Sequence, residues 1–463
     1  LNDKAWARWT ALVLIASMMF FGYMFVDVMS PIQALMESQK GWGPDTFGTY
    51  AASEYIVNVL GFLIIAGVIL DKMGVRFTGV LSASMMFIGA LIKFIGITDW
   101  FAQTALADWL NSWWVTLPAS AKMACFGFML FGCGCEMAGT TVSKAIAKWF
   151  KGKEMALAMG LEMAIARVGV FAIFSISPII ANHFGTVVAP VAFCTVLLLI
   201  GLITFIVFTF MDKALDKQMG VTEEAADPEE EFKFSDLGKI FSSQVFWIVA
   251  LLCVLYYSAI FPFQRYGANM LQCNLDGISA EAAANIFRWF PIGAAVITPF
   301  LGNFLDRKGK GATMLIGGAL LLICCHLVFA FVLPATKSPV IAYSTIVLLG
   351  ISFALVPAAL WPSVPKIIDE KILGSAYCLI FWVQNIGLCC VPKLIGNLLA
   401  STNADNPAVI EAKAAGAEFI PYDYTVPLLV FASFGVLALL FAIYLKALDK
   451  KRGFGLEQPN IKQ

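Results

Sequence analysis

Long apolar runs separated by short polar breaks cover almost the whole chain. Many of these runs reach the length of about 18 residues that an α-helix needs to cross a hydrocarbon core about 30 Å thick. Because only helices and closed barrels satisfy their backbone hydrogen bonds in lipid, the pattern predicts an all-α integral membrane protein with twelve membrane-spanning helices. We expect these spans at residues 9–35, 46–70, 77–98, 121–148, 155–181, 187–211, 243–268, 280–305, 312–333, 339–365, 373–400 and 425–447.

A long polar break after the sixth span divides the chain into two halves. It contains the acidic segment TEEAADPEEE, which is typical of a solvated linker. We therefore predict an N-terminal six-helix half at 1–211, a linker at 212–242 and a C-terminal six-helix half with a short tail at 243–463. Most lysines and arginines lie on the side of this linker and of both termini, so the positive-inside rule predicts that this side is cytoplasmic.

Composition excludes several classes of function. The 463 residues are 60% hydrophobic and only 13% charged, and 31 basic residues balance 31 acidic ones, which does not indicate a nucleic-acid partner. All cysteines except Cys273 lie within apolar runs, which is typical of core packing. With two histidines and no visible nucleophile–base arrangement, the sequence predicts neither an enzyme nor a metal or cofactor site.

The fourth and fifth spans flank the basic turn KGKE, and each carries a charge well inside an apolar run. Glu136 lies 14 residues before Phe150, and Arg167 lies 13 residues after Glu154. At about 1.5 Å per residue, both lie roughly 20 Å from the turn and therefore at a similar depth. One ionised side chain there costs about 2.5–3.5 kcal/mol, so these charges indicate either a substrate pathway or an ion pair that locks two helices together.

Two loops at equivalent positions of the two halves repeat one pattern. The first copy, GVILDKMGVR, begins at Gly67, and the second, GNFLDRKGK, begins at Gly302. A pattern duplicated in this way predicts parallel halves related by an axis along the membrane normal. The candidate gate residues are Gly67, Asp71, Gly74 and Arg76 in the first copy and Asp306 and Arg307 in the second.

With twelve predicted spans and a cytoplasmic linker, this duplicated pattern resembles the GxLxDxxGxR signature of the major facilitator superfamily. The resemblance implies a cavity lined by spans one, four, seven and ten and flanked by spans two, five, eight and eleven. It also gives the aspartate a role: we expect Asp71 to pair with Arg76 and with a helix N-terminus in the other half, closing the cytoplasmic side. The alternative is that the loop only fixes a tight turn.

Ionisable residues concentrate on the spans that this family places around its cavity. Candidates for coupling or charge tuning are Asp27, Glu54, Glu162, Arg288 and Lys393. On the outer spans, we expect Lys93 to reach the membrane surface and His326 to be a core histidine. Candidate substrate contacts are Tyr256, Tyr257 and Phe261 on span seven, Trp361 on span ten, and Trp382, Gln384 and Asn385 on span eleven. Helix packing is the alternative reading of each aromatic residue.

Four segments resemble the lysosomal dipeptide transporters of this superfamily and their bacterial relatives. They are WFKGKEMALAMGLEMAIARVG, YYSAIFPF, GISFALVPAALWPSVP and GSAYCLIFWVQNIG. The resemblance implies that Glu136 and Arg167 bind the substrate, since a dipeptide offers an ammonium and a carboxylate. Glu162, Arg288 and Lys393 stand where the animal proteins of this family have uncharged residues. These additional charges could couple transport to protons, so we consider this alternative as well.

The sequence thus predicts an alternating-access transporter for dipeptides or similar small zwitterions. A proton-coupled symporter for an organic anion is the alternative, and a transport-inactive receptor or scaffold is the alternative of another class. We expect a small-molecule substrate and the lipid bilayer as partners, no nucleic acid, and a monomer. The sequence lacks Asn-x-Ser/Thr sequons and an acidic-dileucine signal near its N-terminus, which predicts a bacterial inner membrane, with the lysosomal membrane as the alternative.

Overall fold

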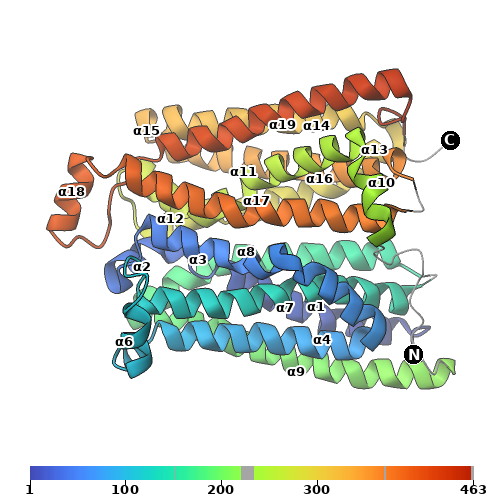
Figure 1. Cartoon of the computed structure of the whole chain (residues 1–463), viewed down its shortest axis with the longest axis horizontal. Coiled ribbons are helices and arrows are strands. Elements are labelled where there is room, and N and C mark those ends of the chain that lie inside the picture. Colours follow the sequence, from blue (N-terminus) through green and yellow to red (C-terminus); the bar gives the residue numbers. More distant parts are fainter. Residues whose placement is uncertain (152, 221–233, 370–371, 460–463) are drawn as a thin grey trace. The chain divides into compact units, whose positions relative to one another are not determined.

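The computed structural model describes residues 1–151, 153–220, 234–369 and 372–459. Within these ranges the protein is built from helices and contains no β-strand, as the apolar pattern predicts (Figure 1). Its internal contacts separate it into two compact units, Leu1–Trp42 with Thr49–Pro228 and Gly43–Gly48 with Glu229–Gln463. The acidic part of the predicted linker, residues 221–233, lies outside the described residues.

The first unit contains the helices of the N-terminal half. In chain order they are α1 (Ala5–Asp27), η1 (Ser30–Ile32), α2 (Gln33–Lys40), α3 (Pro44–Val57), η2 (Asn58–Phe62), α4 (Leu63–Gly96), α5 (Asp99–Ala102), α6 (Ala105–Asn111), α7 (Ala119–Phe150), α8 (Met155–Phe184) and α9 (Val188–Met219). The first turn of α3, within residues 43–48, groups with the second unit instead. Extensive packing joins α4 to α7 and α9, and α1 to α8 and α9.

The second unit contains the helices of the C-terminal half. They are η3 (Phe234–Asp236), α10 (Leu237–Phe241), α11 (Gln244–Asn274), α12 (Ala280–Phe287), α13 (Trp289–Lys308), α14 (Gly311–Leu327), η4 (Val328–Val332), α15 (Leu333–Thr336), α16 (Pro339–Ile367), α17 (Leu373–Thr402), α18 (Pro407–Ala414) and α19 (Thr425–Arg452). Here α14 packs on α16 and α19, and α11 packs on α17 and α19.

Eleven helical segments of the described chain are long and apolar enough to cross a membrane. One of them, Pro44–Gly96, has 53 residues and would be about 80 Å long as a straight helix, far more than one membrane crossing needs. The backbone breaks within it at Gly74, where φ is 73° and ψ is 173°. This segment therefore contains the second and third predicted spans, which accounts for twelve crossings.

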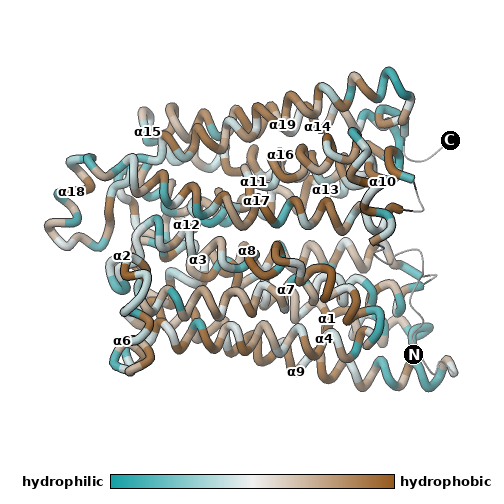
Figure 2. The backbone as a smooth tube through the Cα atoms, in the orientation of Figure 1, coloured by the Kyte–Doolittle hydropathy of each residue, from teal (hydrophilic) through white to brown (hydrophobic). Residues whose placement is uncertain are grey.

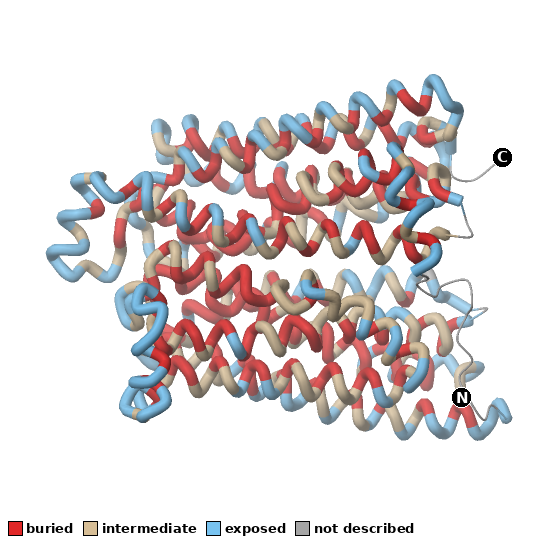
Figure 3. Tube along the Cα trace, in the orientation of Figure 1, coloured by how far each residue is buried: buried red, intermediate tan, exposed pale blue. Residues whose placement is uncertain are grey.

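Many exposed side chains on these helices are large and apolar. Leu60, Val340 and Phe210 are 80%, 72% and 68% exposed, although such side chains are normally buried in a water-soluble protein. Hydrophobic residues follow the long helices along most of their length, and polar residues gather toward helix ends and loops (Figure 2). Exposed positions occur along the long helices as well as in the loops (Figure 3). This distribution is the one that a multi-pass membrane protein requires.

Two short helices with exposed indoles follow α4. Trp100 in α5 and Trp109 in α6 are 69% and 60% exposed. Lys40 at the end of α2 forms an ion pair with Asp99 in α5, with 2.7 Å between Nζ and Oδ1. Exposed indoles of this kind are typical of a segment at a membrane–water interface.

The prediction for Lys93 is wrong. Instead of reaching the membrane surface, its side chain is fully buried, and its ammonium donates a hydrogen bond to the Tyr50 hydroxyl. The Nζ atom lies 4.1 Å from the Phe25 ring centroid and 5.0 Å from that of Phe128. Aromatic faces attract cations, so this cage stabilises a charge that burial alone would disfavour. His326, in contrast, is a buried core histidine as predicted, with 3.0 Å between Nε2 and the Ala259 carbonyl oxygen.

Candidate substrate-binding site

In the first unit, a glycine brings two of the predicted carboxylates together. A Cβ atom on Gly132 of α7 would collide with the backbone oxygen of Glu54 on α3, so the two backbones touch only because this residue is glycine. Glu136 lies one helical turn after Gly132 and is close enough to Glu54 for their charges to repel each other. Glu54 is 4% exposed and Glu136 is half-buried, so the two helices bring a pair of acidic groups into the interior of this unit.

Tyr23 belongs to this acidic cluster, and sequence reasoning missed it. Its hydroxyl on α1 interacts electrostatically with Glu54, Glu136 and Glu162. The signal that could have found it is its spacing, since Tyr23 precedes Asp27 by one helical turn on the same span. We call Tyr23, Glu54, Glu136 and Glu162 the carboxylate cluster.

Arg167 lies on α8, the helix that also carries Glu162. Both side chains are half-buried, and α8 packs against α1 and α7. The structure thus carries Glu136 and Arg167 on neighbouring helices of one unit, and their similar depth remains a prediction. Asp27 is 1% exposed at the end of α1, where Ser30 donates a hydrogen bond to its Oδ1 atom over 3.2 Å. Asp27 therefore has a local partner at the α1–η1 junction.

In the second unit, aromatic side chains from three helices form a continuous cluster around Trp361 of α16. Its ring stacks on Phe381 of α17 with centroids 5.0 Å apart, and its Nε1 atom donates a hydrogen bond to the Tyr257 hydroxyl over 3.2 Å. Tyr257 in turn stacks on Phe261, with centroids 5.5 Å apart. The predicted residues Tyr257, Phe261 and Trp361 thus lie together, and Phe381 is a member that sequence reasoning missed. We call these four residues the aromatic cluster.

Other candidates on the same helices make local contacts. Tyr256 is fully buried and its hydroxyl bonds to the backbone of Ser352, which favours a structural role. Asn385 is 2% exposed and donates from Nδ2 to the Phe381 carbonyl over 2.9 Å. Gln384 accepts a weak hydrogen bond from the Cys253 thiol over 3.6 Å. Trp382 is half-buried beside them on α17.

Arg288 and Lys393 are the two cations of the second unit that we predicted for coupling or charge tuning. Arg288 is half-buried at the junction of α12 and α13, with its guanidinium carbon 5.5 Å from the Trp289 ring centroid. Lys393 on α17 is half-buried and donates to the backbone oxygen of Asp45 over 3.3 Å. Asp45 belongs to residues 43–48, which group with this unit.

The repeated motif of the first unit is held by a network of charges, but not by the predicted pair. Asp71 faces Lys144 of α7, with 3.4 Å between Oδ1 and Nζ, and no pairing with Arg76 occurs in the described chain. Arg76 instead pairs with Asp212, at 3.1 Å, and with Asp216, both on α9. The kink at Gly74 separates Asp71 from Arg76, so the arginine reaches a different helix.

Lys148 of α7 completes this network. Its Nζ atom lies 2.8 Å from a carboxylate oxygen of Asp212 and 2.8 Å from one of Asp216. Trp149 also donates to Asp212 over 2.9 Å. The motif therefore joins α4, α7 and α9. In the second unit, Asp306 and Arg307 lie in the last turn of α13, and Gly309 follows with φ at 73°.

A model of the Major Facilitator Superfamily matches residues 12–392. The chain belongs to this superfamily. Membership indicates a transporter rather than an enzyme, and it agrees with the duplicated motif, the twelve crossings and the two helical units. The structure resembles solved members of the superfamily. The nucleoside transporter NupG has a TM-score of 0.65 and 13% identity, with 95% of this chain and 99% of that chain covered.

The D-xylose-proton symporter gives a TM-score of 0.63 and 14% identity over 93% of this chain and 96% of that chain. At these identities the likeness concerns the fold alone. Among curated proteins, the lysosomal dipeptide transporter MFSD1 of Homo sapiens is 27% identical over 349 residues, 72% of this chain and 68% of the human protein. The Danio rerio protein of the same name is 29% identical over 358 residues, 74% of this chain and 69% of its own.

Proposed function

We propose that this transporter moves dipeptides or similar small zwitterions by alternating access. The observation that carries the proposal is that the carboxylate cluster, with Glu136 on α7, and Arg167 on the neighbouring helix α8 lie in one unit. A zwitterion needs an anionic group and a cationic group, and one unit of this protein supplies both. The similarity to proteins named lysosomal dipeptide transporters supports the same substrate class.

Each end of a dipeptide has a chemical match among these residues. Its ammonium would bind Glu136, with the Tyr23 hydroxyl nearby, and its carboxylate would bind Arg167, which can form two parallel hydrogen bonds to it. Hydrogen bonds to charged groups contribute about 1.5–3 kcal/mol each, enough for recognition when water is excluded. We propose that the aromatic cluster contacts the substrate's side chains, because flat apolar faces accept side chains of many shapes.

Thermal stabilisation of the purified protein tests the substrate class. A ligand that binds only the folded state raises the melting temperature by mass action. Dipeptides, single amino acids, sugars and dicarboxylates would be compared on wild type, Glu136→Gln and Arg167→Ala, with Glu411→Gln on exposed α18 as the control. We expect a dipeptide-dependent rise in wild type and the control that disappears in both site variants. A rise with sugars or dicarboxylates alone would contradict the proposal.

A second candidate is proton-coupled symport of an organic anion, with Arg167, Arg288 and Lys393 binding the anion. The close approach of Glu54 to Gly132, one helical turn before Glu136, favours it, since two neighbouring carboxylates can share one proton. Uptake into proteoliposomes with and without an inward proton gradient separates the candidates. Gradient-driven accumulation that is lost in Glu162→Gln or Glu54→Gln would favour symport, and gradient-independent exchange favours the zwitterion transporter.

We further propose that the protein works as a monomer with both termini in the cytoplasm of a bacterial inner membrane. The lack of sequons and the clustering of basic residues near the linker and termini support this location. Membrane fractionation tests the location of the protein, and light scattering of the detergent-solubilised protein tests its oligomeric state. Recovery from an internal organelle membrane, or a dimer mass, would contradict them.

A further inference from the structure

The chain turns back on itself after the last spanning helix. α19 ends at Arg452, and Gly453, with φ at 72°, reverses the backbone. Residues 453–458, which we call the strap, then run to the turn between α13 and α14. There Lys310 donates its backbone N–H to the Glu457 oxygen over 3.0 Å, and Gly311 donates to the Leu456 oxygen over 3.0 Å. Leu456 is 1% exposed, so the strap buries an apolar anchor.

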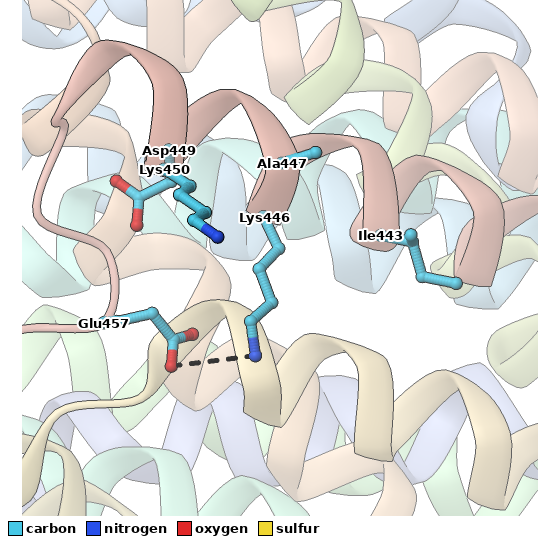
Figure 4. Close-up of a pocket in the computed structure, with 6 residues that line it drawn as sticks. All are labelled: Ile443, Lys446, Ala447, Asp449, Lys450 and Glu457. Atoms are coloured by element: carbon cyan, nitrogen blue, oxygen red, sulfur yellow. Dashed lines mark ion pairs between the residues drawn. The ribbon is translucent and has the colours of Figure 1, made fainter.

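The side chain of Glu457 caps the beginning of α14. Its Oε1 atom accepts the backbone N–H of Thr313 over 2.7 Å, and its Oε2 atom accepts the Thr313 hydroxyl over 2.8 Å. A carboxylate at this position satisfies amide groups that the helix leaves unpaired and interacts favourably with the helix dipole. Lys446 of α19 approaches the same carboxylate at 4.0 Å, beside a pocket of about 480 Å³ (Figure 4).

The strap also holds the end of α16. The Lys366 ammonium donates to the backbone oxygens of Gly455 and Gln458, each over 3.3 Å. Lys366 lies five residues after Trp361, the centre of the aromatic cluster, and prolines at 357, 362 and 365 interrupt this part of the helix. Each proline removes one backbone hydrogen bond from the helix and weakens it locally. The contacts of Lys366 with the strap therefore restrict the movement of this end of α16. Three helices, α14, α16 and α19, therefore meet on the strap.

The repeat identifies what the strap replaces. Gly67, Asp71 and Gly74 correspond to Gly302, Asp306 and Gly309, so Arg76 corresponds to Gly311. The partners correspond as well. Asp216 lies four residues before the glycine that ends α9, and Asp449 lies four residues before the glycine that ends α19. In the first unit Arg76 binds Asp216, whereas in the second the backbone N–H of Leu456 donates to Asp449 Oδ1 over 3.1 Å.

An arginine and the strap exclude each other at this position. A Cβ atom on Gly311 would lie 2.9 Å from the Leu456 oxygen, which is tighter than real Cβ contacts allow. A Cβ atom on Gly309 would collide with Gln458. Gly311 is therefore required because the strap's backbone occupies the space that corresponds to the Arg76 side chain in the first unit, and Gly309 leaves room for the strap beside it.

We propose that residues 453–458 are a positioning element that takes the place of the motif arginine in the second unit and holds the Trp361-bearing end of α16. The strap sets how readily this end of α16 moves while the transporter changes state. The inference goes beyond the proposed substrate and applies to whatever this transporter carries, so its test needs no substrate.

The test removes the strap and then restores an arginine. Truncation after Arg452 deletes the strap, and truncation after Gln458 is the matched control that keeps it. Gly311→Arg is introduced into the full chain and into the chain truncated after Arg452. Each protein also carries Ser363→Cys, because Ser363 is 3% exposed on α16 and lies beside Gly311. The readouts are the melting temperature and the rate at which a maleimide labels residue 363, followed by peptide mass spectrometry.

We expect truncation after Arg452 to lower the melting temperature and to speed labelling by on the order of tenfold, because local opening becomes easier. Gly311→Arg should reverse both effects in that truncated chain, where the introduced guanidinium reaches Asp449. In the full chain it should give no such gain, because the arginine can reach Asp449 only by displacing the strap's contacts with Lys310, Gly311 and Asp449. A general loss of stability would lower the melting temperature in both chains.

Two results would overturn the proposal. One is equal labelling and equal melting of the two truncated chains. The other is the same effect of Gly311→Arg in both backgrounds. If the shorter chain cannot be purified, Glu457→Gln in the full chain decides, because weakening the cap must speed labelling at residue 363. Unchanged labelling in that variant would overturn the proposal as well.

Discussion

The Nε1 atom of Trp361 donates a hydrogen bond to the Tyr257 hydroxyl over 3.2 Å and so joins α16 to α11 inside the second unit. Tyr257→Phe removes the acceptor while keeping the ring that stacks on Phe261. A neutral hydrogen bond contributes about 1 kcal/mol to stability, so we expect the free energy of unfolding to fall by about that amount. Dipeptide affinity should fall by up to about fivefold, because the Trp361 ring is no longer held in place. Binding titration by thermal shift measures this.

Tyr343→Phe is the matched control for that prediction, since Tyr343 lies on the same helix as Trp361 and is 41% exposed. It should bind like wild type. Equal affinities for Tyr257→Phe and the control would mean that this hydrogen bond does not shape the binding surface.

Asp212 is the acidic residue of the first motif network whose loss should destabilise the fold most. Its side chain is fully buried and accepts from Arg76, Lys148 and Trp149. Asp212→Asn leaves Asp216 to pair with both Arg76 and Lys148, and breaking a buried ion pair costs up to about 3–5 kcal/mol. We expect a large fall in melting temperature and in the yield of purified protein.

Asp71→Asn provides the comparison. Asp71 and Lys144 are about one-third exposed and 3.4 Å apart, so their ion pair contributes at most about 1 kcal/mol. If Asp71→Asn lowers the melting temperature as much as Asp212→Asn does, Asp212 is not the residue on which the network depends most.

The cage around Lys93 makes a prediction that distinguishes volume from charge. Lys93→Ala removes both the cation and most of the side chain, and we expect destabilisation of about 2–5 kcal/mol from the cavity alone. Lys93→Met keeps the volume and loses the hydrogen bond to Tyr50, which should cost about 1–3 kcal/mol. The order of the melting temperatures, wild type above Met above Ala, is the measurement. The reverse order of the two variants would show that the cage is not closely packed.

The ion pair between Lys40 and Asp99 predicts acid sensitivity. The hydrogen bond from Lys40, with its positive charge, holds the pKa of Asp99 below its usual range. A lowered carboxylate pKa stabilises the folded state above the unfolded pKa, about 3.9, and this stabilisation is lost as pH falls through the folded value. Asp99→Asn should therefore lower the melting temperature slightly at neutral pH and bring it level with wild type in acid. Asp108→Asn, in neighbouring α6, is the control and should follow wild type at every pH.

Most of the fold could be predicted from local sequence because lipid imposes a simple rule on each span. Apolar length alone locates the helices, and the spacing of Gly67, Asp71 and Gly74 repeats at Gly302, Asp306 and Gly309 without reference to any distant residue. The aromatic cluster was partly foreseeable for the same reason, since Tyr257 and Phe261 are one turn apart and project from one face of α11.

The partners of charges were not predictable, because they depend on which helices meet. Lys93 lies near a helix end in sequence, yet the packing of α1, α3 and α7 surrounds it with rings. Asp71 and Arg76 are near neighbours along the chain, but the kink at Gly74 sends them to different helices. Tyr23 was missed because a hydroxyl on an apolar span becomes notable only when carboxylates from other helices surround it.

The docking of Leu456 and Glu457 has a practical consequence for fusion proteins. An affinity tag or fluorescent reporter joined directly after α19 would delete both contacts, and one joined within residues 453–458 would pull the backbone away from Gly309 and Gly311. Such a chimera would report the behaviour of a loosened α16. Fusions made beyond Gln463 or at the opposite terminus preserve these contacts, and comparing the two designs reveals whether a purification handle has altered the protein.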